Sequence, residues 1–276
     1  MPELPEVETL RRELATELVG RHITAVRIRK PDIVLPPDSP ARLRREVRGQ
    51  QVIRLERRGK HLLIRLGDGS VLEVQVRMTG RFALGRGAAP ATAGFRHVAL
   101  ELDLDDGRTL FYDDVRRLGG VRVLPADVWK ARSRALGPEP LAPGFRASDL
   151  QTALAGTRAP IKTALMDQER LAGIGNIYAS EILHAARIDP RRPGGSLDAS
   201  EVRRLHRALR RVLRDALRHA GTTLRDYRSV NGQSGRFQNR LRVYGREDAA
   251  CPRCGEAIER LVQAGRSTFH CAGCQR

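Results

Sequence analysis

The segment Val98-Ala-Leu-Glu-Leu-Asp-Leu-Asp-Asp-Gly-Arg-Thr-Leu-Phe-Tyr112 carries the clearest structural signal in the chain. Every second residue from Val98 to Leu104 is apolar, which is the period of a half-buried β-strand. Asp105-Asp106-Gly107 is a typical turn sequence, and a second apolar run follows it. The segment therefore predicts an antiparallel β-hairpin.

Further strand signals lie on the N-terminal side of this hairpin. Apolar runs rich in Val, Ile and Leu occur at 26–28, 52–53, 62–66 and 71–76. Ahead of them, apolar residues recur at helical spacing from Val7 to Leu18, and Gly20 follows as a stop. We expect the strands to pair as antiparallel hairpins in a sandwich or barrel after one N-terminal helix, and we expect residues 86–94, rich in Gly and Ala, to form a mobile loop.

The pattern changes from strands to helices around Gly137-Pro138-Glu139-Pro140, which indicates a domain boundary. Helices are predicted at 147–155 and 160–170, then from the tight turn ending at Asn176 to Ala186, and finally from Asp198 until Gly221. The last helix has one apolar stripe and many Arg residues on its other faces, a pattern more typical of a solvated surface than of a binding surface.

The composition favours a polyanionic partner. The chain has 276 residues, a formal net charge of +18 and a pI of about 11.1. A basic excess of this size indicates nucleic acid as the commonest partner, and the length suggests about two domains. The N-terminus lacks the pattern of a signal peptide, and no apolar run approaches the ~18 residues that span a bilayer. We expect a cytoplasmic protein without membrane segments.

Four cysteines occur, and they form two CxxC pairs near the C-terminus: Cys251, Cys254, Cys271 and Cys274. The separation of the pairs is in the range of a four-Cys zinc site. Disulfides are the alternative, but the thiols of a cytoplasmic protein stay reduced. Four thiolates fill a tetrahedral shell, so the spacing predicts one structural Zn²⁺ at the base of a basic hairpin.

The N-terminus offers a nucleophile. If Met1 is removed, Pro2 carries a free secondary amine, and α-amino groups are partly uncharged near neutrality because their pKa is about 7.7 to 8.0. Amines form Schiff bases with electrophilic carbon. Glu3 is the neighbouring candidate proton donor, and Glu6 is interpreted as support for the terminus and the helix start. The alternative is that these residues only begin a helix.

Seven blocks of the sequence together resemble bacterial formamidopyrimidine-DNA glycosylase. They are Met1-Pro-Glu-Leu-Pro-Glu-Val-Glu8, Arg57-Arg-Gly-Lys-His-Leu-Leu63, Leu136-Gly-Pro-Glu-Pro-Leu141, Ala172-Gly-Ile-Gly-Asn-Ile-Tyr-Ala179, Gly221-Thr-Thr-Leu-Arg-Asp226, Val243-Tyr-Gly-Arg246 and the closing cysteine motif. The resemblance implies an α+β fold with three parts: an N-terminal catalytic β-sandwich domain at 1–135, a helix-two-turn-helix domain with a lesion-capping loop at 136–240, and a zinc finger at 241–276.

The resemblance also implies a bifunctional repair enzyme. Such an enzyme excises oxidised purines, for example 8-oxoguanine and formamidopyrimidines, from double-stranded DNA and then nicks the abasic strand by β,δ-elimination. Pro2 would attack C1′ of the damaged nucleotide, and Glu3 would donate a proton to the opening sugar ring. Lys60 would contact phosphate and assist elimination, and Arg266 would hold phosphates at the lesion. A monomer is expected because a lesion is asymmetric.

The lesion must be turned out of the duplex, and side chains must fill the gap. Met78 and Arg116 match the positions of the family's wedge. His97 and Arg158 match DNA-contact positions, and Asn176 would contact phosphate from a turn between two helices. Residues 222–237 match the segment that covers the everted base.

Three residues depart from the family pattern. Leu118 stands where Phe is usual, Gln75 replaces a common His, and Arg236 replaces a Tyr in the capping loop. The catalytic chemistry should survive these changes, whereas lesion preference and opposite-base discrimination are open.

Two alternatives remain. An endonuclease VIII type enzyme would use the same Pro-Glu chemistry on oxidised pyrimidines, although Leu4-Pro5 and the long 222–237 segment argue against it. A zinc-ribbon DNA-binding protein would bind duplex with steep salt dependence and cleave nothing.

Overall fold

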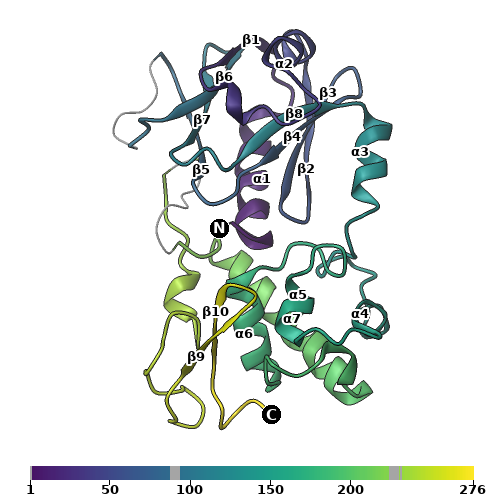
Figure 1. Ribbon diagram of the computed structural model, residues 1–276. Coiled ribbons are helices and arrows are strands. Elements are labelled where there is room, and N and C mark those ends of the chain that lie inside the picture. The colour runs from purple at the N-terminus through teal and green to yellow at the C-terminus, as the bar shows by residue number, and fades with distance from the viewer. Residues whose placement is uncertain (1, 88–93, 224–229, 231) are drawn as a thin grey trace. The chain divides into compact units, whose positions relative to one another are not determined.

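The computed structural model describes residues 2–87, 94–223, 230 and 232–276 (Figure 1). The chain divides into two compact units. Unit 1 comprises Met1–Ser133 and His219–Arg236, and unit 2 comprises Arg134–Arg218 and Phe237–Arg276. Most of the loop predicted at 86–94 and part of the segment predicted at 222–237 lie outside the described residues.

Unit 1 contains two antiparallel sheets of four strands each in its described part. One has the order β1-β6-β7-β5, with bounds Ile23–Ile28, Val98–Leu104, Thr109–Asp114 and Gly80–Gly85. The other has the order β2-β3-β4-β8, with bounds Val52–Arg58, His61–Leu66, Val71–Gln75 and Gly120–Leu124. The predicted hairpin is confirmed, since β6 and β7 pair with Leu102 opposite Leu110. The strands form a sandwich of two separate sheets rather than a barrel.

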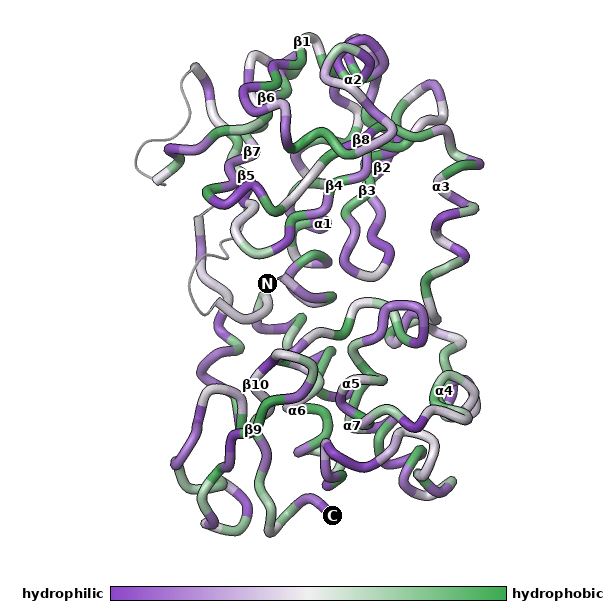
Figure 2. Tube along the Cα trace, viewed as in Figure 1, coloured by the Kyte–Doolittle hydropathy of each residue, from purple (hydrophilic) through white to green (hydrophobic). Residues whose placement is uncertain are grey.

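The core of unit 1 lies between the sheets and beneath helix α1 (Leu4–Leu18). Val7, Leu10, Leu14 and Leu18, the predicted apolar stripe of α1, are each at most 1% exposed. Figure 2 shows hydrophobic stretches along the strands, interrupted by hydrophilic connections. The apolar face of α1 is therefore fixed against a sheet, so the first residues of the chain are attached to a rigid element.

Some elements of unit 1 were not predicted. They are η1 (Pro31–Ile33), α2 (Pro40–Val47), β5, β8 and α3 (Ala126–Ser133). Strand β8 carries Arg122 in the middle of its apolar run, which weakened the strand signal. The structure accommodates this charge because Arg122 forms a buried ion pair with Glu73 of the adjacent strand β4.

Unit 2 is mainly helical, with a small two-stranded sheet at its C-terminal end. Its elements are α4 (Ala147–Leu154), α5 (Ile161–Met166), α6 (Asn176–Ala186), η3 (Gly194–Ser196), α7 (Ala199–Arg218), η4 (Phe237–Arg240), β9 (Glu259–Gln263) and β10 (Arg266–His270). The helix predicted at 160–170 ends early, at Met166. Beyond it, the Gln168 side chain donates to the carbonyls of Met166 and Ile174, which holds a turn instead of another helical turn.

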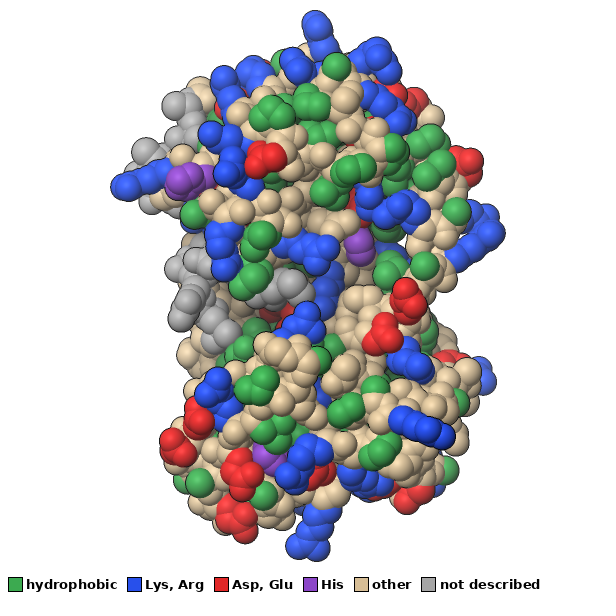
Figure 3. All heavy atoms as spheres, viewed as in Figure 1, with side chains coloured by type: hydrophobic (Ala, Val, Ile, Leu, Met, Phe, Trp, Pro, Cys, Tyr) green, Lys and Arg blue, Asp and Glu red, His purple; other side chains and the backbone are tan. Residues whose placement is uncertain are grey.

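The surface is strongly basic. Figure 3 shows many Lys and Arg side chains on the visible face and fewer acidic ones.

In the part of the chain that the structure describes, no helix combines the length and hydrophobicity needed to cross a bilayer.

Candidate functional site

Pro2 and Glu3 lie at the beginning of α1, and both are buried. Glu3 is the N-cap residue, and it forms a reciprocal capping box with Glu6: the Glu3 side chain accepts from the backbone at position 6, and the Glu3 N–H donates to Glu6 Oε2 at 2.8 Å. A capping box satisfies N–H groups that lack a partner within the helix. The candidate nucleophile is therefore attached to a helix start with a defined geometry.

The second oxygen of Glu6 binds a segment far along the chain. Glu6 Oε1 accepts the N–H of Thr222 at 2.7 Å, and Gly221 adopts φ +78° directly against this carboxylate. A Cβ at Gly221 would lie 2.6 Å from Glu6 Oε1, so only glycine fits there. About two turns further along α1, Glu13 accepts the N–H of Val230 at 2.8 Å. Glu6 thus supports the terminus as predicted, and it also anchors the beginning of the 222–237 segment.

Lys60 lies in the two-residue turn, Gly59-Lys60, that joins β2 to β3. Arg57 fixes this turn to α1: its guanidinium donates to the Gly59 carbonyl at 2.9 Å and to Glu8 Oε2 at 3.3 Å. Burial raises the pKa of Glu8, but hydrogen bonds from Arg11 and Arg12 outweigh it and lower the pKa below its usual value. Glu8 consequently stays ionised as the anchor of the turn that carries Lys60.

Met78 belongs to a pair of adjoining exposed loops. Its side chain is 41% exposed, and Val115 and Leu118 on the neighbouring loop are 49% and 52% exposed. The apolar pattern around Met78 alone would favour a core position, so this exposure supports the alternative, a wedge. Both loops contain an Arg in the left-handed region, Arg77 at φ 50° and Arg117 at φ 52°. Strained backbone of this kind persists only where the surroundings enforce it.

Asp114 holds both loops in this conformation. This fully buried carboxylate accepts from the Thr79 hydroxyl and from the Gly119 N–H, while the Thr79 hydroxyl oxygen accepts the Arg116 N–H at 3.3 Å. Its neighbour Asp113, also fully buried, binds the His97 N–H and the Arg81 guanidinium. Sequence analysis missed both aspartates, because acidic residues at a strand end are also typical of ordinary turns.

A buried ionic group lies in the sheet next to the Lys60 turn. Glu73 of β4 is fully buried and binds Arg122 Nε at 2.6 Å and His61 Nδ1 at 2.7 Å. Burial raises the pKa of Glu73, but the hydrogen bonds from His61 and Arg122 outweigh this effect and bring the pKa to about 2. His61 directly follows Lys60, so the network also fixes one end of the turn.

In unit 2, Arg266 is exposed at the tip of the β9–β10 hairpin. The turn residues Ala264 and Gly265 both have positive φ, as two-residue hairpin turns of type I′ require. The Ser267 carbonyl, directly after Arg266, accepts from Lys162 Nζ and from Asn176 Nδ2, each at 3.0 Å. The structure therefore brings Asn176 and the Arg266 tip together within unit 2.

Asn176 is the first residue of α6, after the N-cap Gly175. Its side-chain Nδ2 donates to the Ser267 carbonyl and to the Tyr244 hydroxyl. An anion at this helix start would therefore be bound by the backbone N–H groups of the first helical turn.

Arg158 is exposed on the loop between α4 and α5. Glu181 of α6, which sequence analysis missed, is buried and accepts the backbone N–H groups of Arg242, Val243 and Tyr244.

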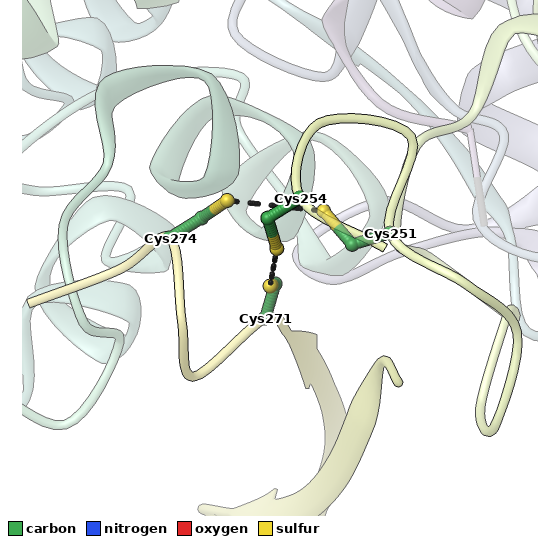
Figure 4. A group of neighbouring side chains, drawn as sticks. All are labelled: Cys251, Cys254, Cys271 and Cys274. Carbon is green, nitrogen blue, oxygen red and sulfur yellow. Dashed lines mark hydrogen bonds between the residues drawn. The ribbon is translucent and has the colours of Figure 1, made fainter. Parts of the chain in front are cut away.

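The four cysteines form one cluster (Figure 4). Their sulfurs all lie within 4.8 Å of one another, with separations of 3.9 Å between Cys251 and Cys274 and 3.4 Å between Cys254 and Cys271. A disulfide needs about 2.05 Å, whereas tetrahedral Zn–S bonds of about 2.3 Å place sulfurs about 3.8 Å apart. The cluster therefore fits a tetrahedral metal ion rather than two disulfides.

His184 supports this cluster from α6. Its Nε2 lies 3.5 Å from Cys251 Sγ, and burial, together with Arg253, lowers the pKa of His184 to about 4. The imidazole is neutral at physiological pH and can donate one N–H to the thiolate, an arrangement that orients metal ligands. The cluster is thereby joined to the helix that begins at Asn176.

The predicted residues fall into two groups by unit. Unit 1 holds Pro2, Glu3, Lys60, Met78, His97 and Arg116, and unit 2 holds Arg158, Asn176, Arg266 and the four cysteines. Within unit 1, α1 and its contacts connect the terminus with the Lys60 turn. Asp113 binds the backbone of His97, and Asp114 binds Thr79, which follows Met78 and accepts the Arg116 N–H.

Three family models match successive parts of the chain. They describe a formamidopyrimidine-DNA glycosylase N-terminal domain at residues 1–121, the H2TH domain of the same enzyme at 136–228, and a zinc finger found in FPG and IleRS at 250–276. The chain belongs to the formamidopyrimidine-DNA glycosylase family. The predicted family, fold class and enzyme class are confirmed by these matches.

Relatives in the formamidopyrimidine-DNA glycosylase family are similar over the whole chain. The enzyme of Chloroflexus aggregans is 44% identical over 276 residues, covering 100% of this chain and 98% of the relative. That of Laribacter hongkongensis is 45% identical over 280 residues, with full coverage of both.

Solved structures of a family member agree in fold. A variant of the Lactococcus lactis enzyme in complex with Fapy-dG-containing DNA has a TM-score of 0.91 and 34% identity, with 100% of each chain covered. The wild-type Lactococcus lactis enzyme bound to DNA with an oxidised pyrimidine has a TM-score of 0.90 and 33% identity, also with full coverage.

Proposed function

We propose that this protein is a bifunctional DNA glycosylase and AP lyase of base excision repair, which removes oxidised purines such as 8-oxoguanine and formamidopyrimidines from double-stranded DNA. The observation that carries the proposal is the helix start: Pro2 and Glu3 are buried at the N-cap of α1, and Glu6 fixes the backbone of Glu3. Membership of the glycosylase family supports the DNA substrate.

The chemistry begins at the Pro2 amine once Met1 has been removed. The nitrogen lone pair attacks C1′, the bond from C1′ to the base breaks, and the base leaves with the proton that the attacking amine gives up. Opening of the sugar breaks C1′–O4′ and produces an iminium, while Glu3 donates the proton to O4′. The iminium acidifies the C2′ hydrogen, so loss of that proton expels the 3′ phosphate, and a second elimination expels the 5′ phosphate. Water then hydrolyses the iminium and restores the amine.

The remaining predicted residues bind the DNA backbone or fill the space that the everted base leaves in the duplex. Lys60 contacts phosphate and assists elimination from its turn, and Arg266 holds phosphates at the lesion from the hairpin tip. The exposed loops of Met78 and Arg116 enter the duplex, where apolar and Arg side chains stabilise a kinked helix. His97, Arg158 and the first turn of α6 at Asn176 bind phosphates.

The four cysteines hold one structural Zn²⁺ in this proposal. The thiolate cluster closes the coordination shell, so the ion stabilises the hairpin that presents Arg266 and takes no part in the reaction. We further propose a cytoplasmic monomer with three functional segments, at 1–135, 136–240 and 241–276.

Borohydride trapping tests the proposal. The enzyme is mixed with duplexes that carry 8-oxoguanine opposite cytosine, thymine glycol or no lesion, and reduction converts any iminium into a stable adduct. We expect adduct on the purine lesion, mapped by mass spectrometry to Pro2. The matched control is Pro5→Ala, which changes the same helical turn but leaves the terminal amine in place and should trap normally, whereas Pro2→Gly should lose most of the trapping.

Two other outcomes have defined meanings. Trapping mainly on thymine glycol would favour a pyrimidine-directed enzyme of the endonuclease VIII type, a class that the complex of the Lactococcus lactis relative with an oxidised pyrimidine keeps relevant. Tight, salt-sensitive binding without adduct on any lesion would mean that the terminus is idle.

A further inference from the structure

Helix α7 carries a continuous row of arginines that the proposed chemistry does not use. Arg203, Arg207, Arg211, Arg214 and Arg218 are exposed, and they lie within about 80° of one another around the helix, opposite its buried apolar stripe. The row is about 22 Å long at ~1.5 Å of rise per residue. The exposed face of α7 therefore presents a positive charge about once per helical turn.

These arginines are poorly neutralised. Among the described residues, no acidic side chain pairs with Arg203, Arg207, Arg211 or Arg214. The fifth arginine of the row, Arg218, pairs with Asp215 at 3.0 Å, and Asp215 also pairs with Arg240 at 3.0 Å. A solvated helix usually intersperses both signs of charge, so a row of one sign concentrates positive potential.

Arg211 and Arg218 of the row also line a cavity of about 690 Å³ in unit 2. Five guanidinium-bearing residues line it: Arg211, Arg218, Arg240, Arg242 and Arg253. Two carboxylates also line it, but the carboxylate of Glu181 is buried and engaged with three backbone N–H groups. Asp215 is therefore left as the accessible acid among five arginines.

The cavity is distinct from the phosphate contact proposed at the start of α6. His184 and Ala185 of its lining are near the end of α6, whereas Asn176 is the first residue of that helix. At ~1.5 Å per residue, the two places are about 13 Å apart along the helix.

We propose that the α7 arginine row and this cavity form a second DNA-binding surface, which takes the sugar-phosphate backbone of an undamaged duplex segment. Arginine matches phosphate geometry with two parallel N–H donors. The length of the row favours a polymer over a compact anion, because about 22 Å corresponds to about six phosphates of one strand at 3.4 Å each. A protein with two such surfaces can hold one DNA segment while it samples another. The inference goes beyond the proposed excision chemistry and depends on none of its steps.

A two-step titration tests the second surface. The full-length protein is first saturated with a 13-base-pair duplex that carries a tetrahydrofuran abasic analogue, and a fluorescent undamaged duplex is then added while its anisotropy is followed. The first titration reports on the proposed function alone, and the second reports on this inference.

The test variant is R203Q/R207Q/R211Q/R214Q, and the matched control is R44Q/R45Q/R48Q/R54Q, which removes the same charge from exposed positions of unit 1. We expect the test variant to weaken the second binding event at least tenfold, and the control to change it no more than twofold. The slope of log K against log salt should fall by about 3 to 4, since each lost phosphate contact contributes about 0.9.

Three results would overturn the inference: a saturated complex that binds no second duplex, equal losses in the test and control variants, or displacement of the second duplex by inorganic triphosphate at the concentration at which the triphosphate binds alone. The last result would assign the cavity to a compact polyphosphate. Circular dichroism and thermal unfolding of both variants would check that they are folded.

Discussion

The start of α1 and the β9–β10 hairpin both carry residues assigned to the reaction, but different interactions hold them in place. At α1, Glu3 and Glu6 cap the helix, and the carboxylates of Glu6 and Glu13 each accept one backbone N–H, from Thr222 and Val230 respectively. At the hairpin, the four cysteine sulfurs lie within 4.8 Å of one another. The Ser267 carbonyl next to the hairpin tip accepts hydrogen bonds from Lys162 of α5 and Asn176 of α6.

The two regions should therefore respond differently when a single stabilising interaction is removed. Hydrogen bonds to a carboxylate contribute about 1 to 3 kcal/mol each, so the α1 region should weaken in steps as they are removed. A structural zinc site is formed by all four ligands together, so the hairpin should fail as a unit. Loss of the metal is therefore expected to have the largest effect on folding.

Removal of the metal should disorder the finger and leave unit 1 folded. Zinc binding contributes about 10 kcal/mol or more in finger peptides, which is more than this small hairpin core can replace. We expect Cys271→Ala, or strong chelation, to release one equivalent of zinc and reduce affinity for lesion DNA about a hundredfold. Zinc analysis and DNA titration check this, with unit 1 followed by hydrogen exchange of α1. Equal loss of protection in α1 would contradict the contrast between the regions.

A change at Glu3 should affect the rate and leave the fold intact. Glu3→Gln keeps an oxygen that can cap α1 but cannot donate the same proton, and general acids contribute about 10² to 10⁴ in rate. We expect base excision to slow about a thousandfold in single-turnover assays, with DNA affinity within threefold of the parent. Pro5→Ala is the control and should retain activity. A large drop in unfolding temperature for Glu3→Gln would instead assign the residue a structural role.

Loss of the buried charge at Glu73 should cost stability. Glu73→Gln removes the anion that pairs with Arg122 and hydrogen-bonds to His61, and breaking a buried ion pair costs about 3 kcal/mol. Because the pKa of Glu73 is lowered to about 2 from 4.5, the carboxylate contributes fully above about pH 4.5, and the contribution disappears as the pH falls through 2. Urea unfolding between pH 7 and pH 3 measures both effects. Glu56→Gln, a more exposed acid of the same sheet, is the control, and a similar loss of stability there would contradict this account.

Truncation of the proposed wedge should have the smallest effect. Met78→Ala removes one exposed apolar side chain and should weaken binding to lesion duplex about tenfold, without a change in thermal stability. Val262→Ala is the matched control, because Val262 is 65% exposed on β9 and has no role in the proposed function. If Met78→Ala destabilises the protein and leaves binding unchanged, Met78 is a packing residue.

Local patterns in the sequence predicted the fold and the metal cluster well. The cysteine spacing places ligands within two short turns, and the alternation from Val98 to Leu104 fixes one strand, so neighbouring residues contain the required information. Helix α6 was predicted to follow the tight turn at 173–176 and to continue to about Ala186, and the structure has it at Asn176–Ala186.

The supporting contacts were not predictable in the same way. Asp114 and Thr79 are 35 residues apart, and Glu73 and Arg122 are 49 apart, so their pairing depends on strand order and not on local pattern. The roles of Pro2, Lys60 and Arg266 in the reaction stay predictions until the trapping experiment is done.

The contact between Glu6 and Thr222 has a consequence for the order of events during synthesis. The two residues are separated by 216 positions, and ribosomes add about 5 to 20 residues per second. Thr222 is therefore synthesised about 10 to 40 seconds after Glu6. Pro2 is buried in the finished unit. For an enzyme that works through the Pro2 amine, an aminopeptidase therefore has this interval to remove Met1 before Thr222 is synthesised. The contact that fixes the reactive end forms only after most of the chain has been translated.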